Sequence, residues 1–207
     1  MRDAAQSDDE KPLGRREARK RATRSALVTV AHRRFHEDGF DATTLDDICD
    51  EVGISRRTFF RYFKSKEDLV FPNREERLER FLRFLAAAPK GDSAIGTLRR
   101  ATRQFGPEYM ANRSQLVAQQ ALVASSPTLE AREAEIDRDW EAAMARAMIA
   151  RSGPSPEATV RARVMAGACI GIIRATMRHW FSTGGTEDLT ALGEAALDCL
   201  EKGFSLD

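Results

Sequence analysis

Residues 43–63 read TTLDDICDEVGISRRTFFRYF, and this stretch decides the fold. Its first part places four apolar residues on one face of a helix: Leu45, Ile48, Cys49 and Val52. Thr44 before them and Asp47 three residues later have the spacing of an N-terminal capping pair. Gly53 follows, and glycine readily adopts the left-handed backbone that ends a helix. The pattern predicts a short helix from Thr44 to Gly53.

The second part begins at Ser55, a favourable helix N-cap, and continues as RRTFFRYF. Phe59 and Phe63 are four residues apart, so they share a face that is expected to pack on the preceding helix. The other face is basic, polar and aromatic, with Arg57, Phe60, Arg61, Lys64 and, at its edge, Thr58. Two short helices joined by a glycine turn predict a helix-turn-helix, whose second helix enters the major groove of DNA.

Polar side chains at the starts of these two helices are candidates to bind DNA phosphate. Helix N-termini present free backbone N–H groups to anions, which makes Thr43, Thr44 and Ser55 the expected phosphate contacts. Arginine reads guanine bidentately in the major groove, and Arg57 is the base-reading residue that the pattern favours most.

Outside this stretch the chain also predicts helices, because alternating β-branched runs are nearly absent. A first helix is expected over residues 15–37, ended by Gly39. A fourth should open at Ser65 and be kinked or restarted at Pro72, and Gly106-Pro107 should break a later helix. The expected class is all-α, with about nine helices. Three segments are predicted: a disordered arm over residues 1–14, a helix-turn-helix DNA-binding domain over 15–64, and a helical regulatory and dimerisation domain over 65–207.

Positive charge gathers in the first third of the chain, although the net charge is only +1. Nine basic residues lie between Lys11 and Arg34 against one acid, Glu17, and residues 55–66 contain no acid. A basic face of this kind would supply the salt-dependent part of DNA binding. The alternative is a solvated helix surface, which charge alone does not exclude.

Composition argues against several other classes of protein. No apolar run is long enough to cross a bilayer, and the polar, acidic opening residues predict no secretory signal. Three scattered cysteines without CxxC spacing favour a reducing compartment, so a cytoplasmic location is expected. His32 and His36 have helical zinc-ligand spacing but no evident third ligand, so no metal site is predicted. No catalytic or cofactor constellation is evident, and the chain is expected not to be an enzyme.

The stretch FHEDGFDATTLDDICDEVGISRRTFFRYFKSKEDLV, residues 35–70, resembles the DNA-binding region of the TetR family of regulators. The matching elements are an aromatic before Gly39-Phe40, the Thr43-Thr44 pair, Ile48, Gly53-Ile54-Ser55, the aromatic-rich third helix and Ser65-Lys66-Glu67-Asp68-Leu69. The likeness covers roughly residues 20–70. For the rest of the chain, only its size, its expected helix count and its lack of strands agree with the family.

The resemblance implies roles for individual residues. Arg56, Arg57 and Thr58 occupy base-reading positions, Phe60 and Tyr62 stand where phosphate or a thymine methyl is touched, and Lys66 corresponds to a phosphate contact. With Arg61 on the same outer face, the full set of predicted DNA-binding residues is Thr43, Thr44, Ser55, Arg56, Arg57, Thr58, Phe60, Arg61, Tyr62 and Lys66. Phe60 has no hydroxyl where the family often has tyrosine, and Arg57 replaces a residue that is often small. Both departures leave the operator sequence open.

The resemblance also implies partners: a palindromic DNA operator, a second copy of the chain paired through the last two helices, and a small-molecule effector that releases a repressor. Six residues were candidates to line an effector cavity: Phe105, Tyr109, Trp140, Met144, Met148 and Met165. Met and aromatic residues at helical spacing are more often core, so no ligand residue is assigned. The alternative is a DNA-binding regulator controlled by a protein partner or acting without a small molecule.

Overall fold

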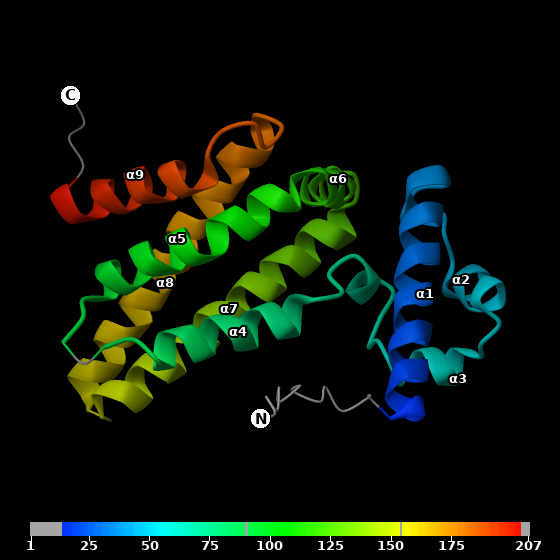
Figure 1. The fold of residues 1–207 in the computed structure, drawn as a ribbon, viewed down its shortest axis with the longest axis horizontal. Helices are drawn as coiled ribbons and strands as arrows, with labels where there is room; N and C mark the ends of the chain where they lie inside the picture. Colours follow the sequence, from blue (N-terminus) through cyan, green and yellow to red (C-terminus); the bar gives the residue numbers. More distant parts are fainter. Residues whose placement is uncertain (1–13, 90, 154, 204–207) are drawn as a thin grey trace, which may run out of the picture. The chain divides into compact units, whose positions relative to one another are not determined.

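A computed structural model describes residues 14–89, 91–153 and 155–203. Within those ranges it contains nine α-helices, one 3₁₀ helix and no strand, which confirms the predicted all-α class (Figure 1). The elements are α1 (Arg15–Glu37), α2 (Leu45–Val52), α3 (Arg56–Phe59), the 3₁₀ helix η1 (Glu67–Leu69), α4 (Arg74–Ala86), α5 (Ala94–Ala111), α6 (Arg113–Ala124), α7 (Pro127–Ser152), α8 (Pro156–Ser182) and α9 (Leu189–Lys202). None of the helices in these ranges combines the length and the apolarity that a bilayer span requires.

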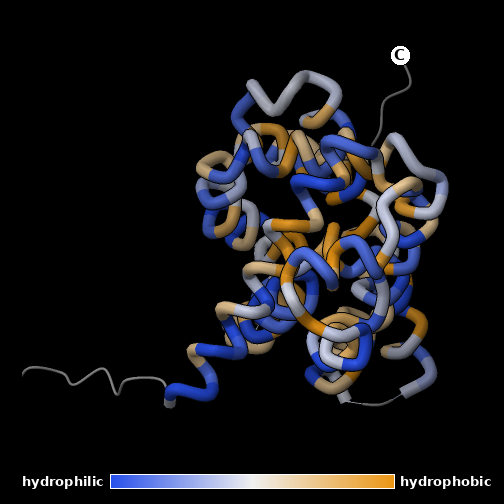
Figure 2. The backbone as a smooth tube through the Cα atoms, turned by 90° about the vertical axis from the view of Figure 1, so that its right-hand side faces the viewer, coloured by the Kyte–Doolittle hydropathy of each residue, from blue (hydrophilic) through white to orange (hydrophobic). Residues whose placement is uncertain are grey.

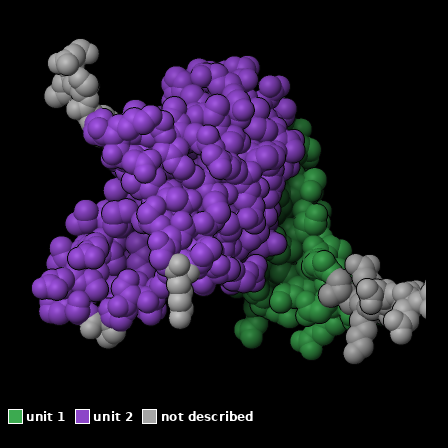
Figure 3. Space-filling model, turned by 60° about the vertical axis from the view of Figure 1, so that its left-hand side comes forward, with its two compact units in different colours: residues 1–72 green, residues 73–207 purple. Residues whose placement is uncertain are grey.

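The chain divides into two compact units, Met1–Pro72 and Asn73–Asp207 (Figure 3). The division falls after Pro72. The DNA-binding domain is predicted from sequence over residues 15–64, and that functional boundary stays a prediction. Leu69 and Val70 are fully buried, and a ring nitrogen of His32 lies 2.9 Å from the carbonyl oxygen of Leu69. These contacts join η1 to the first unit. The arm predicted over residues 1–14 lies outside the described residues, except for Gly14, which precedes α1.

The first unit packs α1 against α2, with α3 beside α2. Its core consists mainly of buried apolar side chains from α1, α2 and α3: Leu27, Ala31, Phe35, Ile48, Cys49 and Phe59. The predicted capping pair is present, because the Thr44 hydroxyl accepts from the Asp47 N–H over 3.1 Å while Asp47 accepts from the Thr44 N–H over 2.8 Å. Gly53 has a φ of 73°, the left-handed conformation predicted for the turn between α2 and α3.

The second unit is a bundle in which α7 packs on α8 and α5 packs on α9. Figure 2 shows apolar and hydrophilic stretches alternating along the helices, as expected for amphipathic helices. One apolar core joins them, and its buried members include Phe81, Leu98, Met144, Ala166, Cys169 and Leu197. The bundle therefore supplies a core independent of the helix-turn-helix.

Three expectations about helix boundaries were wrong. The α3 helix ends at Phe59, and residues 60–63 continue as tighter turns, such as the 2.8 Å bond from the Tyr62 N–H to the Phe59 carbonyl. No α-helix opens at Ser65, where the short η1 forms instead, whereas the start of α4 at Arg74 agrees with the restart expected at Pro72. The α5 helix continues through Gly106-Pro107. Proline removes only one backbone donor of the helix. Gly106 lies so close to Thr190 of α9 that a β-carbon at this position would collide with the threonine side chain.

Candidate nucleic-acid interface

Buried aromatic side chains position the second helix of the helix-turn-helix. Phe59 is fully buried and Phe63 almost so, and their rings stack with centroids 5.7 Å apart, which confirms their predicted core role. Ser55 caps the helix as predicted, since its hydroxyl accepts from the Thr58 N–H over 3.2 Å. The same hydroxyl lies 3.0 Å from that of Thr58. This arrangement fixes the first turn of α3 and aims its other face at solvent.

That outer face is rich in exposed cations and carries an exposed ring. Arg57 and Arg61 are exposed, and neither forms an ion pair with any residue that the structure describes. The Phe60 side chain is 52% exposed, which is unusual for a phenylalanine with a large apolar ring. Tyr62 is half-buried beside them. Two unpaired guanidinium groups flanking an exposed ring can hydrogen-bond to bases or phosphates and contact a thymine methyl.

Arg56 differs from its neighbour. Its guanidinium lies 3.3 Å from the carboxylate of Asp46 on α2, and both side chains are more than half exposed. The two adjacent arginines therefore have different charge environments. Arg56 has an anionic partner within the motif, and the charge of Arg57 is uncompensated. No sequence pattern indicated this pairing across ten positions.

The hydroxyls of Thr43 and Thr44 are already engaged inside the chain. Thr43 is buried, and its hydroxyl donates to the Gly39 carbonyl over 2.8 Å. The Thr44 hydroxyl belongs to the capping pair, and the hydrogen bond from that hydroxyl, followed by the one from the Thr44 N–H, lowers the pKa of Asp47. Their contact with phosphate remains a prediction.

Lys66 is also engaged within the chain. Its Nζ donates to the carbonyl oxygens of Phe40 and Thr43 over 2.7 and 2.8 Å and lies 4.0 Å from the centroid of the Phe40 ring. Burial lowers the pKa of Lys66. The lysine thereby holds the loop that leads into α2. An ammonium group has three N–H donors, so one remains for the predicted phosphate contact.

A basic hollow between α1 and the segment from Ile54 to Tyr62 extends the outer face of α3. Its lining includes Arg16, Arg19 and Lys20 of α1 and Thr58, Arg61 and Tyr62, and Glu17 is the one acid among the residues that line it. The sequence showed that the start of α1 is basic. It did not show that these basic side chains line the same hollow as Arg61. Clustered cations of this kind suit a polyanion such as the DNA backbone.

Comparisons with known proteins match both units. The family model described as "Bacterial regulatory proteins, tetR family" covers residues 27–71, and the model described as "MftR C-terminal domain" covers residues 92–205. The first match spans most of the described helix-turn-helix unit, and the second spans most of the helical bundle.

Individual relatives extend over nearly the whole chain. The transcriptional regulator TcmR of Streptomyces glaucescens is 30% identical over 203 residues, covering 94% of this chain and 89% of TcmR. The regulator MftR of Mycobacterium tuberculosis is 25% identical over 194 residues, covering 93% of this chain and 97% of MftR. Among solved structures, a TetR-family regulator from Streptomyces coelicolor A3 has a TM-score of 0.59 at 21% identity, covering 92% of this chain and 98% of that one. The last likeness shows the fold.

Proposed function

The chain belongs to the TetR family of bacterial regulatory proteins, and on that premise we propose that it is a repressor that binds a palindromic operator as a homodimer. It is a transcriptional regulator by family. In the proposed mechanism, α3 enters the major groove and a small molecule in the second unit shifts the protein away from the DNA-binding state.

One observation carries the DNA-binding site: Arg57 of α3 and Arg61 of the turns that follow it are exposed and have no ion-pair partner in the described part of the chain. An uncompensated cation on a recognition helix costs little in water and can pair with phosphate or guanine on binding. The basic hollow beside it adds sequence-independent attraction. Among the ten predicted DNA-binding residues, these features support Arg57 and Arg61 foremost.

The homodimer is supported by an exposed apolar strip on α8. Val160 and Val164 lie one turn apart and are 63% and 65% exposed, and they line a shallow hollow with Met165. Exposed valines at helical spacing favour burial against a second helix. A two-fold symmetric dimer would place two recognition helices about 34–36 Å apart, one turn of DNA.

Two alternative functions can be distinguished from the proposed one by experiment. A regulator controlled by a protein partner would bind DNA but show no ligand-dependent thermal stabilisation. A helical enzyme would need a catalytic constellation, and the relatives are transcriptional regulators. We therefore propose a non-enzymatic DNA-binding protein of the cytoplasm that needs no cofactor.

The test is fluorescence anisotropy with duplex DNA from the region upstream of the protein's own gene. We expect binding that weakens steeply with salt, and a loss of at least about tenfold in the Arg57→Ala, Arg61→Ala double variant. The matched control is Arg83→Ala, Arg146→Ala, which removes two exposed cations from the second unit. Unchanged binding in the Arg57→Ala, Arg61→Ala variant would refute the site, and a chain that binds none of the upstream duplexes would refute the function.

A further inference from the structure

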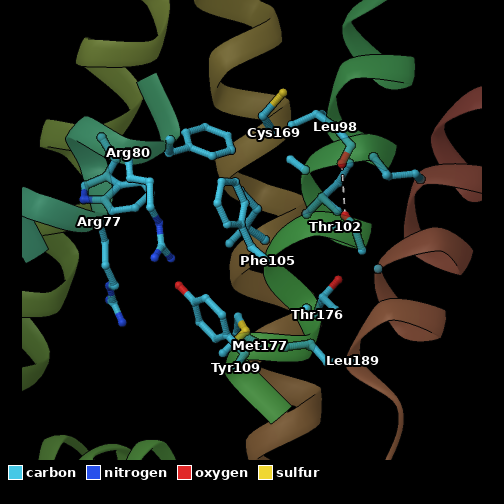
Figure 4. Close-up of a pocket in the computed structure, with 18 residues that line it drawn as sticks. Arg77, Arg80, Leu98, Thr102, Phe105, Tyr109, Cys169, Thr176, Met177 and Leu189 are labelled. Carbon is cyan, nitrogen blue, oxygen red and sulfur yellow. Dashed lines mark hydrogen bonds between the residues drawn. The ribbon is translucent and has the colours of Figure 1, made fainter. Parts of the chain in front are cut away.

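The second unit contains a cavity of about 160 Å³ between α4, α5, α7, α8 and α9 (Figure 4). Its walls are mostly apolar. Of the six residues considered from sequence, Phe105, Tyr109 and Trp140 line it, whereas Met144 and Met148 belong to the surrounding core and Met165 lies at the separate hollow on α8. Cys169 and Met177 line it as well, and no sequence pattern indicated either residue.

One end of the cavity is a box of aromatic rings. The Phe81 ring stacks on Trp140 with centroids 5.9 Å apart, and the Phe105 ring lies 6.3 Å from Phe81. Burial raises the pKa of the Cys169 thiol to about 11, so this thiol is uncharged at neutral pH. A box of this kind favours an apolar ring, because aromatic pairs gain energy beyond the area that they bury.

Beside these rings, the cavity wall presents two hydrogen-bond donors without partners. The Nε of Arg77 is buried and has no hydrogen-bond partner, and its guanidinium carbon lies 5.7 Å from the centroid of the Tyr109 ring. The Tyr109 hydroxyl has no hydrogen bond to any residue that the structure describes, and in Figure 4 it points toward the side of the cavity that holds Arg77 and Arg80.

The two arginines at this part of the cavity are not equivalent. Arg80 pairs with Glu108 over 2.7 Å, so its charge is compensated within the chain. Arg77 has no ion pair with any described residue. A partly buried cation with an unsatisfied donor is costly unless an anion pairs with it. An anion bound at this part of the cavity would pair with Arg77 and could accept from its Nε.

We propose that this cavity binds a small monocyclic aromatic carboxylate, with its ring among Phe81, Phe105 and Trp140 and its carboxylate on Arg77 and Tyr109. The volume supports a single ring, since an engineered cavity of about 150 Å³ in another protein holds benzene. A neutral hydrocarbon would leave Arg77 unpaired, and a cation would be repelled by it. The inference rests on the proposed function for its regulatory meaning and supplies the chemical class of the effector.

The test is isothermal titration calorimetry with phenylacetate and with phenylacetamide, a neutral compound of nearly the same shape. We expect phenylacetate to bind with a Kd of about 1 mM or tighter, and phenylacetamide to bind at least about tenfold more weakly. Arg77→Gln should weaken phenylacetate binding by about tenfold to a hundredfold and leave phenylacetamide unchanged, because only the acid uses the charge. Arg83→Gln, on the same helix but outside the cavity, is the matched control.

A second variant keeps the proposal testable if Arg77→Gln does not fold. Tyr109→Phe keeps the ring and removes only the hydroxyl, and it should weaken phenylacetate binding by about three- to tenfold. Equal affinity of the native protein for acid and amide, no acid binding, or equal losses for both compounds in Arg77→Gln would overturn the proposal.

The same protein samples are then titrated with operator DNA in the presence of each compound. Selective release by phenylacetate supports the proposal. DNA binding without selective carboxylate binding overturns the ligand class alone, whereas selective carboxylate binding by a chain that binds no DNA overturns the proposed function alone.

Discussion

The guanidinium of Arg56 lies 3.3 Å from the carboxylate of Asp46, so an ion pair joins the two helices of the helix-turn-helix on their exposed side. An exposed pair of this kind contributes little to folding, because water screens it and both side chains lose freedom. Its main effect is on charge, since it leaves Arg57 as the uncompensated member of the arginine pair.

The first prediction follows from that difference. Arg57→Ala should weaken DNA binding more than Arg56→Ala, because Asp46 partly compensates the charge of Arg56. Asp46→Asn should strengthen binding by up to about fivefold, since it frees Arg56 and removes a negative charge near the phosphates. Anisotropy titrations of the three variants at one salt concentration measure this. Equal losses in the two arginine variants would count against a separate role for Arg57.

The second prediction concerns the cap of α2. Thr44→Ala removes the hydroxyl that accepts from the Asp47 N–H and should lower the free energy of unfolding of the first unit by about 1 kcal/mol. Asp47 should then titrate closer to its ordinary pKa, because the hydrogen bond that lowers that pKa is lost. Urea unfolding and NMR titration check the two effects, and Thr44→Ser should restore both.

The third prediction concerns Lys66. Lys66→Met keeps an apolar stem but leaves the carbonyls of Phe40 and Thr43 without their donor, so the first unit should lose about 2 kcal/mol of stability. If the third N–H contacts phosphate, the slope of log K against log salt for DNA should also decrease by about one. We expect both changes. A stability loss with an unchanged salt slope would remove Lys66 from the DNA-binding residues.

The fourth prediction concerns acid unfolding. Glu51 accepts from Arg33 and from Arg34, the latter over 2.8 Å, and these bonds, that of Arg33 above all, lower the pKa of Glu51 below its ordinary 4.5. The stabilisation is therefore complete above pH 4.5 and is lost as the pH falls through the lower folded value.

Glu51→Gln should accordingly reduce stability at neutral pH and flatten its decline as the pH falls below 4.5. Denaturant midpoints measured across that window provide the check. Glu79→Gln, an exposed residue of α4, is the control and should leave the pH profile as it is. An equally steep decline in Glu51→Gln would show that other carboxylates dominate acid unfolding.

Local features of the first unit could be predicted from residues a few positions apart. The Thr44–Asp47 cap, the left-handed Gly53 and the buried Phe59–Phe63 pair were all confirmed. Capping bonds and side chains at i and i+4 depend on neighbours within one turn, which the sequence displays directly. The second unit gave fewer such signals, and the expected break at Gly106-Pro107 was wrong.

The amino-acid order alone determined that the chain is helical and where its recognition motif begins and turns. It also determined that the rings of Phe59 and Phe63 face the core. Only the tertiary structure decided that Asp46 pairs with Arg56, that Lys66 holds the loop before α2, and that Arg77 faces a cavity without a partner. The physical reason is the separation in sequence between the residues that interact. Helix periodicity and capping act within a turn, whereas ion pairs and cavities depend on side chains that packing brings together from distant positions.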